Sequence, residues 1–421
     1  MLKCSYAYMK IGIDASRAFG ANPTGIEIYA LEVIRNLRTF FEGEEVVLYV
    51  RKGAVIPFDL PAAWRVREIG WTYLWTQGGL SWEMFFHPID VLFVPAHTLP
   101  FVHPRQSVVV VHGLEYEKCP EGYSFVSRMF LRLFTKYSVR AASRVIAVSE
   151  ATKRDVVGLY GVDEGKISVV YEGGVSDKGQ VTSDMQREAR EIGMRNVKLG
   201  LQSRKRVGVK NSEIWVNSRD LSPVTCPLSQ GFPCFLFIGR LETRKNVVRM
   251  VQAFGKFRER SRNVHRLVLA GSPGYGYGAI RKAIETSPFC EDIIESGYVS
   301  EGEKYELLRN AEALLFVSLA EGFGLPVLEA QEAGVPVVCS DIPVLREIAG
   351  DGAVFADPED VDGIAEAMTR LREDASAWRS ARPDKNASAW RSGNVVEWGR
   401  KNVERFSWEG CAREISDIMK Q

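Results

Sequence analysis

Two carboxylates flank a glycine-rich turn in the segment LAEGFGLPVLEAQEAG, where Glu321 precedes the turn and Glu329 follows it. The turn comes after the apolar run EALLFVS, so the pattern predicts a strand, a tight turn and a helix. Gly322 and Gly324 allow the backbone to approach a ligand closely, and Pro326 suits the first helical position. The unpaired N–H groups at such a helix start favour an anion such as phosphate.

A carboxylate beside an anion site is repelled by the anion unless it serves another group of the ligand. Hydroxyl groups are suitable partners, because an ionised carboxylate accepts hydrogen bonds and donates none. A ligand with phosphates and several hydroxyls meets both conditions, so the segment predicts a sugar nucleotide. Taken alone, Glu329 is equally typical of an ordinary first-turn acid that complements the helix dipole.

Cations for the phosphates are found in the segment FIGRLETRKN, where Arg240 follows a predicted strand and Lys245 precedes a predicted helix. Arginine binds a diphosphate in bidentate fashion, and lysine acts as a point charge. A single basic residue in such a loop is more often solvated surface. The hypothesis therefore rests on the two cations occurring together with the carboxylates.

Composition narrows the class of protein. The chain has 421 residues and a formal net charge of +1, with 54 Lys and Arg against 53 Asp and Glu. This length favours two domains, and the balanced charge argues against a nucleic-acid partner. Its 7 cysteines are scattered without a C-x-x-C pair, which is typical of a reduced, cytoplasmic protein. No apolar stretch is long enough to span a bilayer, and the first eight residues lack the apolar core of a signal peptide.

The elements that must position these residues are short apolar strands alternating with helices. In residues 1–175 the strands are expected in KIGIDAS, EVVLYV, DVLFVPAH, SVVVVHG, RVIAVS and KISVVYEGG. The alternation of strands and helices is lost in 176–232, which we interpret as a linker with an insertion and one helix near 183–193. It returns in 233–404 with CFLFIGRL, RLVLAGS, IIESGYV, ALLFVS and VPVVCS. Such patterns predict an α/β protein of two doubly wound, Rossmann-like domains that face each other across a cleft.

These motifs resemble those of a known enzyme family. EGFGLPVLE resembles the E-x7-E motif of the retaining glycosyltransferases of family 4, which have the GT-B fold, and GRLETRKN resembles their diphosphate clamp. RVIAVSEATKRDVVGLYGVDEGKISVVYEGG resembles the end of their first domain. ERFSWEGCAREI resembles their C-terminal helix, so residues 405–421 are expected to pack back on that domain. The resemblance leaves out the opening residues, 176–232 and the duplicated ASAWRS of 375–396.

The resemblance implies roles for particular residues. The implied catalytic residues are Glu321, His112, Arg240 and Lys245. The implied donor-binding residues are Gly25, Val299, Gly322, Phe323, Gly324, Leu325 and Glu329. Glu321 would contact hydroxyls of the sugar and Glu329 those of the ribose. Two positions depart from the pattern: Thr24 precedes Gly25 where many relatives pair two glycines, and Gly113 stands where Asp is frequent.

The implied reaction moves a hexose, with mannose favoured, from a nucleoside diphosphate sugar to a hydroxyl of a glycan or lipid-linked acceptor. LWTQ and DVLFVPAHTLP look most like bacterial enzymes of surface-polysaccharide assembly, for which GDP-mannose is the first donor to test. Neither a cofactor nor a metal is expected. Peripheral contact with the inner membrane face is left open by the cationic run QSRKRVGVK, which is otherwise solvated surface.

Several readings stay open at this stage. His112 on its own is more often a satisfied buried histidine than a catalytic one, and His97 also follows a strand and could reach an acceptor. Asp360 and Asp362 form a D-x-D, but early acids also suit a helix start. GSPGYGYGAI is interpreted as a flexible loop. A sugar-nucleotide epimerase, a phosphorolytic enzyme and a non-catalytic sugar-nucleotide-binding protein are alternatives, since fold does not fix function.

Overall fold

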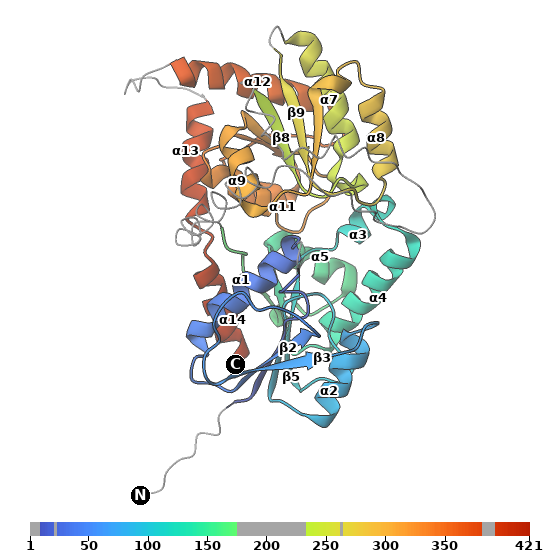
Figure 1. Ribbon diagram of the computed structural model, residues 1–421, viewed down its shortest axis with the longest axis vertical. Helices are drawn as coiled ribbons and strands as arrows, with labels where there is room; N and C mark the ends of the chain where they lie inside the picture. Colours follow the sequence, from blue (N-terminus) through green and yellow to red (C-terminus); the bar gives the residue numbers. More distant parts are fainter. Residues whose placement is uncertain (1–8, 21–22, 175–232, 262–263, 381–391) are drawn as a thin grey trace, which may run out of the picture.

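The computed structural model describes residues 9–20, 23–174, 233–261, 264–380 and 392–421. They form two α/β units stacked along the long axis of the molecule (Figure 1). The helix expected near 183–193 and the run QSRKRVGVK lie outside the described residues.

The first unit contains a parallel sheet of seven strands in the order β3-β2-β1-β4-β5-β6-β7. Its strands are β1 (Ile11–Asp14), β2 (Val46–Arg51), β3 (Trp64–Ile69), β4 (Val91–Val94), β5 (Gln106–Val111), β6 (Arg144–Ala147) and β7 (Ile167–Val169). Six of them coincide with the predicted apolar runs. The sequence did not indicate β3, because this edge strand is buried only at its two ends and carries charged residues between them.

The second unit contains a parallel sheet of six strands in the order β10-β9-β8-β11-β12-β13. Its strands are β8 (Cys234–Ile238), β9 (Arg266–Ala270), β10 (Ile293–Gly297), β11 (Ala313–Phe316), β12 (Val337–Ser340) and β13 (Val354–Ala356). The sequence indicated all but β13, a three-residue edge strand. Two doubly wound, Rossmann-like parallel sheets are therefore confirmed.

Helices cover both faces of each sheet (Figure 1). Those of the first unit are α1 (Gly25–Phe40), α2 (Ser81–Phe86), α3 (Glu115–Lys118), α4 (Phe125–Ala141) and α5 (Glu150–Tyr160). Those of the second are α7 (Val247–Arg260), α8 (Tyr277–Glu285), α9 (Glu301–Asn310), α10 (Leu325–Glu332), α11 (Pro343–Ala349), α12 (Val361–Ser380) and α13 (Ser392–Val403). The last helix, α14 (Trp408–Met419), returns to the first unit and packs on α1.

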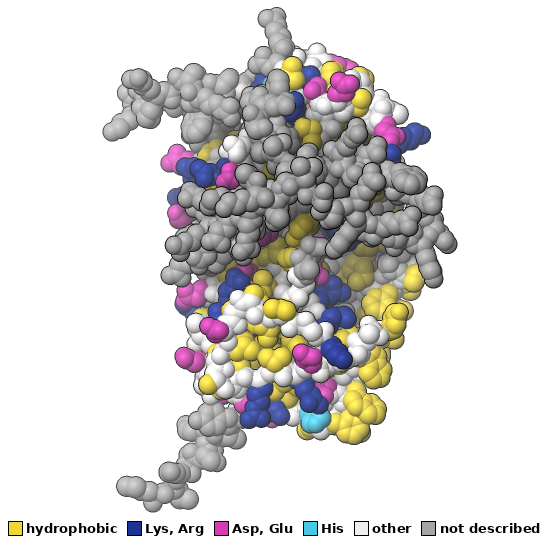
Figure 2. Space-filling model, in the orientation of Figure 1, with side chains coloured by type: hydrophobic (Ala, Val, Ile, Leu, Met, Phe, Trp, Pro, Cys, Tyr) yellow, Lys and Arg dark blue, Asp and Glu magenta, His cyan; other side chains and the backbone are white. Residues whose placement is uncertain are grey.

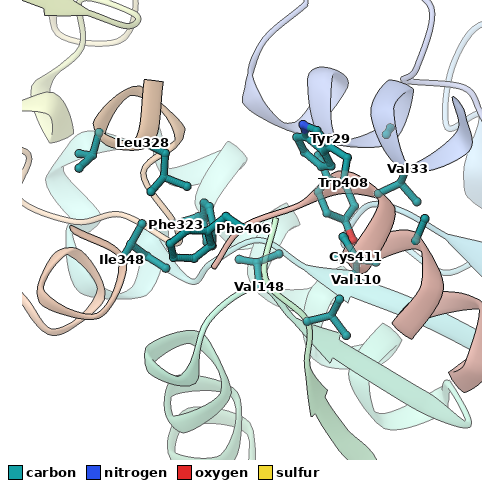
Figure 3. Packing of buried hydrophobic residues seen from close by; sticks show 14 of the residues in the cluster. Tyr29, Val33, Val110, Val148, Phe323, Leu328, Ile348, Phe406, Trp408 and Cys411 are labelled. Atoms are coloured by element: carbon teal, nitrogen blue, oxygen red, sulfur yellow. The ribbon is translucent and has the colours of Figure 1, made fainter. Parts of the chain in front are cut away.

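The buried core is continuous from one unit to the other. Phe323 of the second unit packs edge-on against Phe406, with 5.8 Å between ring centroids, and Trp408 packs against Tyr29 of α1 at 5.9 Å (Figure 3). The returning chain lies so close to the end of the first unit that a Cβ on Gly173 would come within 2.3 Å of Trp408. This packing fixes the first unit against the segment that leads out of the second.

Candidate active site

The topology explains why residues far apart in sequence meet. In the second sheet the chain builds outward from β8 in one direction, to β9 and β10, and then returns to add β11 on the other side of β8. The segments that follow the carboxyl ends of β8 and β11 therefore run to opposite faces of the sheet, and such a switch point leaves a crevice between them. The turn Thr243–Lys245 follows β8, and Glu321 follows β11. Asn246 holds this turn in place: its backbone is left-handed, with φ of 60°, and its side-chain amide donates to the carbonyl oxygens of Val317 (2.9 Å) and Pro358 (2.7 Å).

Glu321 lies between two cations. Its Oε1 is 2.5 Å from Lys245 Nζ, and its Oε2 is 3.3 Å from Arg244 Nη1. Burial alone would raise the pKa of Glu321, but Lys245 and Arg244 lower it by more, so the net shift is downward. The group is therefore an ionised acceptor at neutral pH, held in one orientation.

Arg244 is the cation that the sequence reasoning missed. Besides Glu321, its guanidinium contacts Glu242 at 2.8 Å and approaches Glu115 of the first unit to 4.0 Å. Burial lowers the pKa of Arg244, but these carboxylates raise it by more. Arg240, which the sequence favoured, is exposed in the loop after β8, so the cations that contact Glu321 are Arg244 and Lys245. The adjacency of Arg244 and Lys245 in TRKN was the available signal.

Burial has opposite effects on the pKa values of Lys245 and Glu115, two further ionisable groups beside Arg244. It lowers the pKa of Lys245, and the nearby Arg244 lowers it further, against the raising effect of Glu321. Burial raises the pKa of Glu115, which reaches the cluster from the first unit. A buried lysine beside a carboxylate keeps its charge only while a negative partner is close. The cluster is therefore suited to exchange one anion for another.

The glycine turn is one of the places where the two units touch. A Cβ on Gly322 would come within 1.5 Å of the His112 carbonyl oxygen, so only glycine permits this approach. The carbonyl oxygen of Gly322 also accepts hydrogen bonds from Ser149 Oγ (2.9 Å) and Thr152 Oγ1 (3.2 Å) of the first unit. The glycine predicted to approach a ligand thus also approaches the opposite unit.

Helix α10 begins directly after this turn. Gly324 is its N-cap with φ of 118°, a conformation that favours glycine, and Leu325 is its first residue, one before the predicted Pro326. Phe323 is buried in the core between the units, which anchors the turn. At the far end, Gly334 has φ of 71°, as expected of a glycine that ends a helix.

His112 reaches the same place from the end of β5. Its Nε2–H donates to the Pro95 carbonyl oxygen (2.9 Å), since a carbonyl oxygen only accepts, and its Nδ1 lies 3.1 Å from Glu172. Tyr29 packs edge-on against the ring at 4.5 Å. Both ring nitrogens of this buried side chain therefore lie within hydrogen-bond distance of an oxygen atom, while its backbone faces Gly322. Glu172 was not predicted, although it belongs to the motif YEGG.

His97 is the neighbouring histidine, with its ring centroid 5.4 Å from that of His112. Burial lowers the pKa of His97 to about 3, with smaller contributions from His112 and Arg17. Its Nδ1 is buried without a hydrogen-bond partner among the described residues. A ring nitrogen of a neutral imidazole can form a hydrogen bond with a hydroxyl group, as donor or as acceptor according to the tautomer.

Glu329 lies one helical turn into α10 and is paired. Lys304 of α9 contacts it at 2.6 Å and also contacts Glu301 at 3.0 Å. Burial lowers the pKa of Lys304, but Glu329 and Glu301 raise it by more. Val299 lies just before α9, half-buried against the core. Val299 and Glu329, which the resemblance assigned to donor binding, therefore lie just before α9 and on α10, and Lys304 is a second cation that the sequence reasoning missed.

Gly25 begins α1, as predicted, and among the residues that the structure describes none beyond its chain neighbours and its own helix lies within 4 Å of a Cβ at this position. Glu27, however, caps this helix start through the backbone N–H of Thr24 at 2.9 Å, and Arg17 lies 3.3 Å from Glu27. The carboxylate already occupies the positive end of the helix dipole, which makes this end less favourable for a phosphate than the sequence suggested.

Two lesser motifs are resolved by their contacts. Asp360 accepts a hydrogen bond from the backbone N–H of Asp362 (3.0 Å) at the start of α12, so the D-x-D is a helix start. GSPGYGYGAI forms a loop as far as Gly276, in which Gly274 N–H donates to the Leu241 carbonyl oxygen (2.9 Å), and α8 begins at Tyr277. Among the described residues, no group of three or more His, Cys, Asp or Glu is placed to hold a metal ion.

Comparison with protein families gives one match for each unit. The family described as Glycosyltransferase Family 4 matches residues 23–174, and that described as Glycosyl transferases group 1 matches residues 226–390. No helix in the described part of the chain combines the length and apolar character needed to cross a membrane.

Curated relatives include two O-antigen enzymes. The O-antigen chain mannosyltransferase B of Escherichia coli is 32% identical over 185 residues, which is 44% of this chain and 45% of that protein. The O-antigen chain mannosyltransferase RfbU of Salmonella typhimurium is 24% identical over 277 residues, 66% of this chain and 63% of that protein. The matched regions thus span less than two thirds of either relative.

Solved structures share the fold over nearly the whole chain. WaaG, a glycosyltransferase involved in lipopolysaccharide biosynthesis, has a TM-score of 0.66 and 15% identity, covering 97% of this chain and 99% of its own. Alr3699/HepE of Anabaena, in complex with UDP-glucose, has a TM-score of 0.64 and 15% identity, covering 98% and 100%. At this level of identity the likeness supports the fold and no finer property.

Proposed function

We infer that this chain, which belongs to the glycosyltransferases of the GT-B fold with a family 4 unit and a group 1 unit, transfers a hexose from a nucleoside diphosphate sugar to a hydroxyl of a glycan or lipid-linked acceptor. Mannose is the favoured sugar, because both O-antigen relatives are mannosyltransferases. We also propose that the transfer retains the anomeric configuration and requires no metal ion.

The observation that carries the proposal is the meeting of Glu321, Lys245 and Arg244 beside the N-terminus of α10. An ionised carboxylate accepts hydrogen bonds from sugar hydroxyls, and the cations with the N–H groups of Phe323 to Leu325 neutralise a phosphate. Such an arrangement suits a ligand whose diphosphate and sugar lie next to each other.

The chemical step follows from this arrangement of charges. As the bond between the anomeric carbon and the diphosphate breaks, negative charge grows on the leaving phosphate, and Lys245, Arg244 and the N–H groups of the turn stabilise it, with Arg240 of the exposed loop after β8 as a further cation. The acceptor hydroxyl attacks from the same face, and the leaving phosphate takes its proton. His112 and His97 lie on the first unit, where the acceptor would approach.

A panel of donors tests the proposal most directly. Thermal shift is measured with GDP-mannose, UDP-glucose and the free nucleoside diphosphates, because a bound donor raises the melting temperature by mass action. We expect GDP-mannose to give the largest shift. Transfer is then followed with a glycan acceptor in excess EDTA, and the anomeric coupling of the product is read by NMR.

The outcomes separate the competing functions. An epimerase would convert the donor without an acceptor, and a binding protein would shift in melting temperature without turnover. If no nucleotide sugar shifts the melting temperature, the donor assignment is wrong. An inverted product, or activity that needs magnesium or manganese, would contradict retention or metal independence respectively.

A further inference from the structure

A shallow hollow of about 440 Å³ lies on the first unit at the carboxyl end of the edge strand β3. It is lined by the end of β3, the residues that follow this strand and the start of α2, and it shares no lining residue with the candidate active site. Two tryptophans in this lining, Trp71 and Trp82, are exposed by 49% and 61%. Figure 2 shows hydrophobic side chains gathered at the right edge of the first unit, where α2 lies in Figure 1.

The indole ring of Trp71 lies flat on the backbone below it. A Cβ on Gly78 would come within 2.9 Å of both Cε2 and Nε1 of this ring and within 3.1 Å of Cζ2. Because Cε2 lies between the other two atoms and is no further away than they are, the face of the ring makes this contact and not its edge. A Cβ on Gly79 would meet the Cβ of Trp71 at 2.8 Å. Glycine at these two positions therefore permits the ring to rest against the chain.

The backbone that supports the ring has two uncommon features. Both glycines belong to a π-helix, Thr76–Leu80, a rare element that is frequent at functional sites. Just before it, Leu74 has φ of 48°, a left-handed conformation that is costly for a bulky side chain. Trp75 attaches the segment to β3, because its Nε1–H donates to the Ile69 carbonyl oxygen at 3.3 Å. The position of the exposed ring is therefore fixed by the fold.

Charged and polar groups stand beside the two tryptophans. Arg67 of β3 and Glu83 of α2 form a forked contact, in which Nε lies 3.0 Å from Oε1 and Nη2 lies 3.4 Å from Oε2. Glu83 is only 8% exposed, so this contact holds it in one orientation. An arginine carries more N–H donors than such a contact uses, and a carboxylate has further lone pairs. Glu68 and Thr72 add a second carboxylate and a hydroxyl to the lining.

This combination of groups suits a carbohydrate. One face of a hexose ring consists largely of C–H groups, which stack on an aromatic face because the π electrons give that face partial negative charge. The hydroxyls around the rim of the sugar need hydrogen-bond partners, and carboxylate and guanidinium groups supply them. An acyl chain in the same place would remove water from Arg67 and Glu83 and return no hydrogen bond, which is unfavourable.

The place of the hollow in the sheet relates it to the candidate active site. Trp71 follows β3 and His112 follows β5, so both lie at the carboxyl edge of the same parallel sheet. Three strands lie between β3 and β5, so four spacings of about 4.8 Å separate the ends of the two strands by about 19 Å. A chain of several hexoses spans such a distance. A glycan that ends at the candidate active site can therefore lie with an inner sugar on Trp71.

We propose that this hollow is a carbohydrate-binding subsite, in which an inner hexose of the acceptor glycan stacks on Trp71. The identification of this glycan as the acceptor rests on the proposed function, whereas the binding of a saccharide in the hollow does not. The subsite narrows the class of acceptor. It favours an oligosaccharide or polysaccharide over a lipid that carries a single sugar, because only a longer chain reaches both places.

Binding to the full chain without donor tests the proposal. The probes are mannotetraose and maltotetraose, two linear hexose chains, and binding is measured by calorimetry. Trp71→Ala should raise Kd about tenfold through the lost stacking contact, whereas Trp71→Phe, which keeps an aromatic face, should raise it about twofold. Trp398→Ala removes an exposed tryptophan from α13 of the second unit and should leave Kd unchanged. In NMR, the indole N–H signal that Trp71→Ala removes should shift when saccharide is added to the wild type.

Transfer assays connect the subsite to the proposed reaction. With the wild type, the KM for the acceptor should fall as the acceptor is lengthened from a disaccharide to a hexasaccharide, and in Trp71→Ala this dependence should be lost. Glu321→Gln should bind mannotetraose as the wild type does while transfer is lost. If the donor panel gives no shift but saccharide binding still depends on Trp71, the proposed function fails and the subsite stands.

Three outcomes would overturn the proposal. One is a wild-type chain that binds neither saccharide and whose Trp71 indole signal does not move. Another is an equal loss of binding in Trp71→Ala and Trp398→Ala, which would place the saccharide elsewhere. The third is a concentration-dependent dimer that Trp71→Ala abolishes without any effect on saccharide binding, since the hollow would then be an interface between copies. Thermal unfolding checks that each variant folds, and the half-exposed Trp71 should contribute little to the melting temperature.

Discussion

Glu347 of α11 connects the two units through the backbone of α5. Its Oε1 accepts a hydrogen bond from the N–H of Glu150 (2.7 Å), and its Oε2 accepts one from the N–H of Ala151 (3.0 Å). These N–H groups belong to the first turn of α5, which helix hydrogen bonding leaves unpaired. A side chain of the second unit thus satisfies the helix start of the first. We predict that Glu347→Gln shifts the protein toward an arrangement in which the units are further apart.

The size of the effect follows from the contacts. Glutamine keeps one acceptor oxygen, so the substitution removes one hydrogen bond and the negative charge. A hydrogen bond to a charged group contributes about 1.5–3 kcal/mol when buried, and an anion at a helix N-terminus about 0.3–1 kcal/mol. Because this carboxylate is partly exposed, we expect the lower part of that range, about 1–2 kcal/mol. That corresponds to a change of about 5- to 30-fold in the ratio of closed to open molecules.

Two measurements check this prediction. Small-angle X-ray scattering should give a larger radius of gyration for Glu347→Gln than for the wild type. The dissociation constant of the nucleoside diphosphate that the donor panel identifies should fall, by at most the factor given above, because the units must separate at the Gly322 turn before the diphosphate can reach Lys245. Glu366→Gln, on the exposed part of α12, is the control, since its contact with Arg370 is a surface pair of little energy.

A variant with the scattering curve and nucleotide affinity of the wild type would refute the reasoning. It would mean that the contacts of Gly322 with His112, Ser149 and Thr152, together with the core around Phe323, determine the arrangement of the units without help from Glu347. A variant that unfolds at a lower temperature without opening would show that the carboxylate stabilises α5 alone.

Four further predictions concern the charges of the site. Lys245→Ala should lower kcat by about 100- to 1000-fold, as does the loss of one donor to a developing negative charge, measured in a single-turnover assay. Glu329→Ala should weaken the binding of free nucleoside diphosphate in calorimetry, whereas Glu321→Gln should spare that binding and impair transfer. Lys304→Met should also destabilise the fold, because it leaves the buried Glu329 without its cation, so unfolding in urea should show a loss of several kcal/mol. Burial holds the pKa of His97 at about 3, so the unfolded chain binds one more proton than the folded chain between pH 3 and about 6.5. The free energy of unfolding should therefore decrease as the pH is lowered through this range, by up to about 1.4 kcal/mol per pH unit, and His97→Gln should make that slope smaller.

The interior of the fold could be predicted from sequence because its signals are local. Runs such as VVVV of β5 and ALLF of β11 are buried on both faces, so their residues are almost all apolar. The edge strand β3 escaped prediction because its outer face is solvated and its residues WRVREI mix charges with apolar groups. Contacts between residues far apart in the sequence could not be predicted either, since nothing near His112 indicates that its ring lies beside Glu172, sixty residues later.

The candidate site was predictable in its residue types and less so in its pairings. Glu321, Lys245 and Glu329 all lie at the carboxyl edge of the second sheet, as their positions after strands implied. The cations that pair with Glu321 and Glu329 could not be predicted, because Arg244 and Lys304 look like ordinary surface residues in the sequence. What turns them into site residues is burial, which requires each charge to find an opposite charge nearby.

That requirement connects the charges of the site to the movement of the units. In the structure the backbone of Gly322 touches His112, so a donor sugar beside the turn needs the units to separate first. Once they separate, a diphosphate can take the place of Glu321 as the anion nearest Lys245, and the carboxylate is released to the sugar hydroxyls. Binding is then an exchange of one ion pair for another, which avoids leaving a buried lysine uncompensated. The energy that opposes binding is mainly that of separating the units, and the contacts of Glu347 and of the Gly322 carbonyl oxygen determine its size. Affinity for the donor should therefore respond to residues of α5 and α11 that never touch it.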